Sequence, residues 1–172
     1  MTSIGTKHKT IRFSRYQQIH STVIEQYKAR DFIDSETLEF RPAAYGIMLQ
    51  GEIGCLGNLV IGVEKFLDVS EPSKGAMVQT RWYSYNVFVR NRYNVFRYDN
   101  QDDDYLRQGH QDEHHKHIFD WRTGEESPDS PIWVGFNGWL TLGEVIQEVE
   151  DWYWQHRNEL PDCDSYPELG TR

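Results

Sequence analysis

The chain has 172 residues, 38% of them hydrophobic and 14% aromatic, and carries a formal net charge of −9. This length predicts one domain spanning residues 1–172, and the many aromatic rings can fill a core, which excludes a wholly disordered chain. The acidity argues against a general nucleic-acid coat, and no apolar run approaches the roughly 20 residues that span a bilayer, so we expect no membrane contact.

The first predicted element is a helix over residues 14–30. Its large apolar side chains recur at spacings of three and four residues, which places them on one face of the helix. They are Tyr16, Ile19, Val23 and Tyr27. We therefore assign residues 1–35 to an N-terminal helical segment.

Strand signals dominate residues 36–136, where β-branched and aromatic residues are frequent. The connections between them are too short for helical crossovers, so the strands should pair antiparallel. Glycines inside the long stretch 55–69 indicate bulges and a strongly curved sheet or partial barrel. The predicted strands are residues 37–40, 45–50, 55–69, 76–89 and 93–98, with 114–121 and 132–136 as further candidates.

A second helix is predicted over residues 141–158. Thr141 and Glu144 have the spacing of a capping box, and apolar residues then recur on one face. Pro161 ends the helix, and residues 159–172 should form a loose tail. The fold class is therefore α+β, with an antiparallel sheet of about five strands and an N-terminal and a C-terminal helix packed on it.

Basic residues are concentrated in two stretches of this acidic chain. Residues 72–98 hold five basic residues and no acidic one, and residues 1–30 hold six basic residues and Glu25. These cations could form a local anion-binding face, or they could neutralise acidic neighbours in the folded protein. Cys55 and Cys163 lie too far apart for a zinc ribbon, and Met1–Thr10 lacks an apolar secretory segment, so we expect a reduced, cytoplasmic protein.

The densest chemical feature is a cluster of four histidines within eight residues. In an extended chain, alternate side chains share a face, so His115 and His117 would point the same way and Lys116 the opposite way. Imidazole suits both proton transfer and metal binding. The four histidines are His110, His114, His115 and His117.

Three interpretations of this cluster remain open. In the first, two histidines exchange protons with a phosphodiester, and Arg97, Arg81 or Lys116 stabilises charge on phosphorus; this chemistry needs no cofactor. In the second, His115 and His117 join a carboxylate such as Asp120 or Asp99 around a divalent metal ion. In the third, the histidines form a solvated strand edge, and the chain is a non-catalytic binding protein.

Two motifs also resemble the TumE-like toxins of bacterial toxin–antitoxin modules. The first motif is Phe96-Arg97-Tyr98-Asp99-Asn100, and the second is His114-His115-Lys116-His117, followed by an acidic and hydrophobic final helix. The resemblance covers roughly residues 81–153. It implies a cytoplasmic toxin that is paired with a helix-turn-helix antitoxin.

A ribonuclease activity is our inference from the histidines rather than from the resemblance. The predicted catalytic residues are His115, His117, Arg97 and Asp99. The predicted substrate-binding residues are Arg81, Tyr98, Lys116 and His114. The substrate would be RNA, drawn to the protein by the basic segment 72–98, so activity should fall as salt rises.

Overall fold

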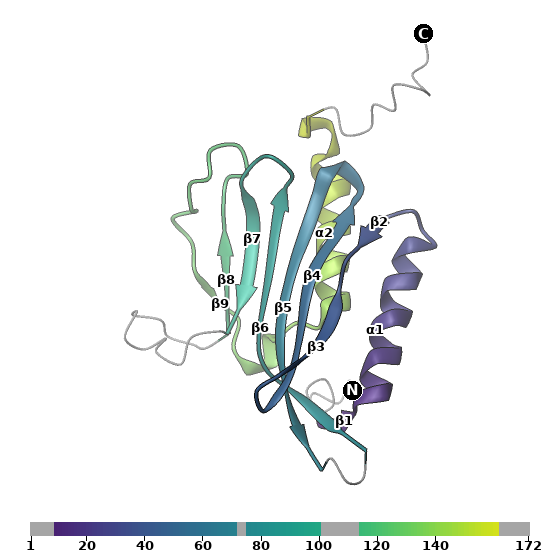
Figure 1. Ribbon diagram of the computed structural model, residues 1–172. Helices are drawn as coiled ribbons and strands as arrows, with labels where there is room; N and C mark the ends of the chain where they lie inside the picture. Colours follow the sequence, from purple (N-terminus) through teal and green to yellow (C-terminus); the bar gives the residue numbers. More distant parts are fainter. Residues whose placement is uncertain (1–8, 72–74, 101–113, 162–172) are drawn as a thin grey trace, which may run out of the picture.

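One antiparallel sheet organises the molecule in the computed structural model, which describes residues 9–71, 75–100 and 114–161. Nine strands belong to this sheet within the described residues, and two α-helices lie on one of its faces (Figure 1). The α+β class is therefore confirmed. The expected strand number, about five, is wrong, because several short edge strands carry too few residues to show a period in the sequence. The predicted tail from residue 162 and the loop 101–113 lie outside the described residues.

The strands run in the order β2, β4, β5, β6, β7, β8 and β9, with β3 also paired to β4 and β1 to one end of β6. Because β9 lies at one edge and β2 and β3 at the other, the sheet is open and not a barrel. The strands are β1 (Ile11–Arg12), β2 (Ile33–Glu36), β3 (Glu39–Ala43), β4 (Gly46–Cys55), β5 (Leu59–Ser70), β6 (Met77–Val89), β7 (Asn94–Asp99), β8 (His115–Ile118) and β9 (Ile132–Trp133).

Two predicted boundaries need correction. Residues 33–35, which we assigned to the N-terminal helical segment, are part of β2, because Ile33 is buried against the sheet and pairs with Cys55. The predicted strand 55–69 begins only at Leu59, after a short turn at Leu56–Asn58. Gly57 has a φ of +73° in that turn, and a Cβ there would lie 2.8 Å from Tyr153, so the turn favours glycine.

The two helices cover the same face of the sheet. Helix α1 (Phe13–Lys28) buries Ile24 and Tyr27, whereas Ile19, predicted on its inner face, is 45% exposed. Helix α2 (Leu142–His156) begins with the predicted capping box of Thr141 and Glu144. It buries Leu142, Val145, Ile146, Val149 and Tyr153. Within the described part of the chain, no helix is long and apolar enough to cross a bilayer.

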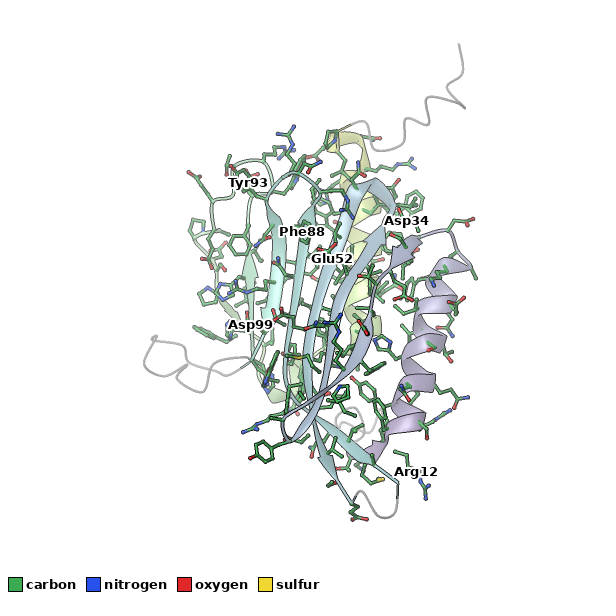
Figure 2. The ribbon with its side chains drawn as sticks, in the orientation of Figure 1. Arg12, Asp34, Glu52, Phe88, Tyr93 and Asp99 are labelled. Carbon is green, nitrogen blue, oxygen red and sulfur yellow. The ribbon has the colours of Figure 1, made fainter. Side chains whose placement is uncertain are left out.

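The core lies between the sheet and these helices. Inward-facing residues of β5 and β6 alternate with outward ones, and Val63, Tyr83 and Tyr85 are almost fully buried. No α-helix of the described residues covers the opposite side of the sheet, which we call the open face (Figures 1 and 2). The residues of β7 and β8 that we predicted as catalytic lie on this open face.

Candidate functional site

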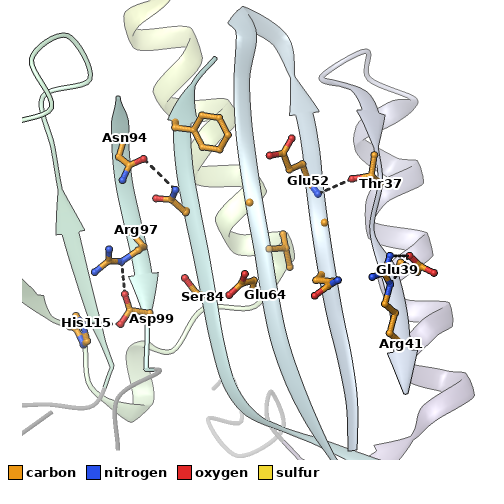
Figure 3. A pocket seen from close by; sticks show the side chains of 16 residues that line it. Thr37, Glu39, Arg41, Glu52, Glu64, Ser84, Asn94, Arg97, Asp99 and His115 are labelled. Atoms are coloured by element: carbon orange, nitrogen blue, oxygen red, sulfur yellow. Dashed lines mark hydrogen bonds and ion pairs between the residues drawn. The ribbon is translucent and has the colours of Figure 1, made fainter. Parts of the chain in front are cut away.

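A polar hollow of about 1090 Å³ occupies the open face. Strands β3 to β8 contribute to it, because alternate residues of a strand point to one side, and a register shift between β6 and β7 brings Asn94 to this side as well (Figure 3). Its charged and strongly polar lining residues are Glu39, Arg41, Gln50, Glu52, Glu64, Ser84, Asn86, Asn94, Arg97, Asp99 and His115.

At one end of the hollow, Asp99 joins a cation and an imidazole. Arg97 donates from Nε to Asp99 Oδ2 at 2.6 Å, and His115 Nε2 lies 3.0 Å from Asp99 Oδ1. The strand register explains the arrangement, since Asp99 pairs with His115 across β7 and β8. Burial alone would raise the pKa of Asp99, but the hydrogen bond from His115 and the charges of His115 and Arg97 hold that pKa below its ordinary value.

A second imidazole with its own carboxylate lies beside the first. The rings of His115 and His117 meet edge to face with centroids 4.9 Å apart, and both residues are buried. His117 Nδ1 lies 2.6 Å from Glu126 Oε1, to which Ser130 Oγ also donates at 2.6 Å. Burial opposes these hydrogen bonds, yet they and the nearby charges hold the pKa of Glu126 below its ordinary value. Each imidazole therefore has a carboxylate that fixes its orientation.

We refer to Arg97, Asp99, His115, His117 and Glu126 as the histidine–carboxylate cluster. The structure brings together all four residues that we predicted as catalytic. Sequence reasoning missed Glu126, which stands in the loop between the candidate strands 114–121 and 132–136. The loop folds back through a turn at Asp120–Gly124, and Phe119 pairs with Glu126 in an isolated bridge. The turn residues were the only signal that could have located Glu126 near the histidines.

Three of the four predicted substrate-binding residues lie on the helix side of the sheet. Tyr98 donates to Glu148 of α2 at 2.9 Å, and Lys116 forms an ion pair with the same carboxylate. His114 stacks on Trp139 with ring centroids 4.8 Å apart, and its Nδ1 lies 3.1 Å from the Tyr83 hydroxyl. These residues alternate with the cluster residues along β7 and β8, so their side chains point to the helix side and contact Glu148 and Trp139 there.

The fourth predicted substrate-binding residue, Arg81, also lies apart from the cluster. The register of β5 and β6 slips between Phe66 and Leu67, which leaves Arg81 without a partner residue across the ladder. Its guanidinium is 3.7 Å from Asp68, and both side chains are exposed. Arg81 lies within β6 and Arg90 directly follows its last residue, so the two are roughly 30 Å apart along the strand. The described basic residues of the stretch 72–98 therefore do not form one compact anion-binding face.

The cluster also has the composition of a metal site. One ligand atom each from Asp99, His115 and His117 lie within 4.8 Å of one another, and all three residues are buried. Two imidazoles and one carboxylate are a common ligand set for divalent transition metals. Asp120, the carboxylate that we had proposed beside Asp99 as an alternative, is exposed and accepts a hydrogen bond from the Arg122 backbone. Of the two, Asp99 is the carboxylate that lies beside the histidines.

Fold and site together define a small α+β protein with helices on one face of an open sheet and a buried histidine–carboxylate cluster on the other. Comparison with protein families is more specific. The family model described as toxin TumE matches residues 20–153, which include the whole cluster, and the chain belongs to this toxin family. Searches of curated proteins and of solved structures gave no match.

Proposed function

We propose that this chain is the toxin of a bacterial toxin–antitoxin module and that it cleaves RNA by histidine acid–base catalysis. One observation carries the proposal: two imidazoles touch each other at the edge of a polar hollow, and each is bonded to its own carboxylate. Membership of the toxin family supports the biological role. The antitoxin partner would be a helix-turn-helix protein, and the site of action would be the cytoplasm, where RNA is accessible.

The reaction follows from the pairing of the histidines. One neutral imidazole takes the proton of a ribose 2′-hydroxyl, and the 2′-oxygen then bonds to the adjacent phosphorus. The bond from phosphorus to the 5′-oxygen breaks, and the second, protonated imidazole gives its proton to that oxygen. A cyclic phosphate and a 5′-hydroxyl are the products. Asp99 and Glu126 stabilise whichever imidazole carries the positive charge.

Arg97 is the cation that would hold the phosphate. Its Nε is bonded to Asp99, and its terminal nitrogens make no other hydrogen bond with the described residues. Its side chain is 37% exposed, and it lines the hollow. A guanidinium presents parallel N–H groups to two phosphate oxygens, so Arg97 can stabilise the charge that develops on phosphorus.

The geometry of Asp99, His115 and His117 favours a second candidate, a metal-dependent nuclease. A divalent ion held by these three residues would polarise the phosphoryl oxygen in place of Arg97. The two candidates differ in a simple measurement. Metal-independent cleavage continues in a chelator and ends in a 2′,3′-cyclic phosphate, whereas metal-dependent cleavage stops in a chelator and recovers when a divalent ion is added.

The experiment that tests the proposal compares four proteins in two assays. Each protein is expressed in a bacterial host without antitoxin to measure growth arrest, and each is purified and incubated with single-stranded RNA to measure cleavage. The four proteins are the wild type, His115→Ala, His117→Ala and the control His156→Ala, which removes a histidine of α2 outside the cluster. Loss of a proton-transfer group should lower the cleavage rate by roughly 10²–10⁴-fold. Equal growth arrest by all four proteins, or intact RNA with every purified protein, would contradict the catalytic assignment.

A further inference from the structure

A second cavity, on the helix side of the sheet, has a composition quite unlike that of the hollow on the open face. It lies between α1, the start of α2 and strands β5 and β6, and its volume is about 290 Å³. Its walls are mostly apolar side chains, with Ile19, Val23 and Leu142 among them. This volume is at the small end of the range for ligand pockets, so a compact ligand would fill it.

A buried lysine forms part of this cavity. Lys65 of β5 is only 8% exposed, and it stands among the apolar residues that face the helices. No carboxylate of the described residues forms an ion pair with its ammonium group. The compensation within the protein comes from Tyr16 and Tyr85. Burial alone would lower the pKa of Lys65, but their hydroxyl groups hold that pKa above its ordinary value, and Lys65 Nζ lies 5.2 Å from the ring centroid of Tyr16 and 5.9 Å from that of Tyr85. Lys65 is therefore a buried cation without a carboxylate partner, at the wall of a cavity that an anion could enter.

Two further polar atoms lie around Lys65. The Tyr16 hydroxyl and His20 Nε2 are buried, and apart from the interaction of Tyr16 with Lys65 neither makes a hydrogen bond within the described residues; both residues line the cavity. Native proteins rarely leave such atoms unsatisfied. Burial, together with the nearby charge of Lys65, lowers the pKa of His20 to about 4, so its imidazole is neutral at neutral pH and can donate one hydrogen bond without adding charge.

The charges around the cavity favour a negatively charged ligand. Lys9 and Lys65 line it, and no aspartate or glutamate does so among the described residues, although the whole chain has a net charge of −9. Glu144 is the acidic residue closest to this region along α2, and its carboxylate is occupied by the Thr141 cap. The hollow on the open face, in contrast, contains four carboxylates and two arginines.

We propose that this cavity, the Lys65 pocket, binds a small amphipathic carboxylate. The carboxylate group would pair with Lys65 and accept hydrogen bonds from Tyr16 and His20, and a short apolar tail would lie against Ile19, Val23 and Leu142. The pocket is on the opposite side of the sheet from the histidine–carboxylate cluster. The proposal therefore goes beyond the proposed nuclease and does not depend on it.

The test is an NMR titration of the full chain with three probes that share one tail: octanoate, octanol and octylammonium. Octanoate should bind at least tenfold more tightly than the other two and should show contacts to the methyl groups of Ile19 and Leu142. Equal affinity for octanoate and octanol, or no binding of octanoate, would overturn the proposal. This comparison uses the wild type, so it stands even if a variant fails to fold.

A pair of variants then identifies the cation. Lys65→Met keeps the shape of the side chain and removes its charge, and it should weaken octanoate binding at least tenfold while changing octanol binding less than twofold. Lys28→Met, which removes a lysine at the end of α1 that pairs with Glu25, should leave both affinities unchanged. Octanoate binding that survives in Lys65→Met would place the ligand elsewhere and contradict the assignment.

Discussion

The buried environment of His20 should make the stability of the protein depend on pH. It belongs to α1 and its ring packs against Phe40, with ring centroids 5.5 Å apart; its folded-state pKa is lowered from 6.5 to about 4 by burial and by Lys65. Between these two values the unfolded chain binds a proton that the folded chain does not bind. Stability is therefore lost progressively as the pH falls from about 6.5 towards 4.

We expect His20→Gln to flatten this dependence. The wild type should lose roughly 1–3 kcal/mol of unfolding free energy through His20 between neutral pH and the folded pKa, and the variant should lose correspondingly less. Urea unfolding at a series of pH values measures the difference. Gln26→His, which adds a histidine on the exposed side of the same helix, is the matched control and should not steepen the curve. Equal pH slopes in the wild type and His20→Gln would contradict the buried, neutral state.

At the same scale, the cluster shows what a residue pattern can and cannot predict. The two-residue period of a strand was enough to place His115 and His117 on one face, and antiparallel return of the chain was enough to bring Arg97 and Asp99 beside them. Glu126 could not be found in this way, because it reaches His117 through a loop rather than through a period. Tyr98 and Lys116 were grouped with the site because of their position in the motif, although the same period places them on the other side.

At the scale of elements, α2 was the most predictable part of the chain because its start is encoded locally. Thr141 and Glu144 cap each other, with Thr141 N donating to Glu144 Oε2 at 2.8 Å. The aliphatic residues that follow, Leu142, Val145, Ile146 and Val149, are all buried. The edge strands were less predictable: β1 and β9 have two residues each, and long-range pairing alone defines them.

The capping box also allows a quantitative prediction. Thr141→Ala removes the hydroxyl that accepts from the Glu144 backbone, and it should lower the unfolding free energy by about 1 kcal/mol. Chemical denaturation measures this change. Thr22→Ala is the control, because Thr22 is exposed in the middle of α1 and its hydroxyl donates only to a carbonyl of its own helix. It should change stability by less than about 0.5 kcal/mol; a loss as large as that of Thr141→Ala would show that the cap is not the cause.

At the scale of the whole molecule, the sheet separates two sites of different composition. The open face carries the nuclease candidate in an acidic hollow, and the helix side encloses a lysine in an apolar pocket. The sheet between them is held to α2 by Glu148, which accepts from both Tyr98 and Lys116. Strands β7 and β8 therefore serve both layers at once, with cluster residues on one side and α2 contacts on the other.

The charge of the open face predicts how RNA cleavage should respond to salt. The sequence indicated a basic segment that draws RNA, which would give a steep fall in activity as salt rises. In the structure the described arginines of that segment, Arg81, Arg90, Arg92 and Arg97, are dispersed, and Arg97 is the residue that faces the reacting phosphate in our proposal. For a single strand held by one cation, affinity should fall only roughly threefold between about 50 and 200 mM salt. The acidic hollow repels RNA, and screening of that repulsion makes the fall shallower still.

The measurement is the KM for a short single-stranded RNA at several salt concentrations, in the wild type and in Arg97→Gln. The variant should lose the remaining salt dependence, since it lacks the cation that releases a counterion on binding. Arg92→Gln, in the exposed turn before β7, is the control and should retain the dependence of the wild type. A fall of roughly 10²-fold or more in the wild type would mean that several cations grip the RNA backbone together, and binding would then have to be assigned to a surface other than the hollow.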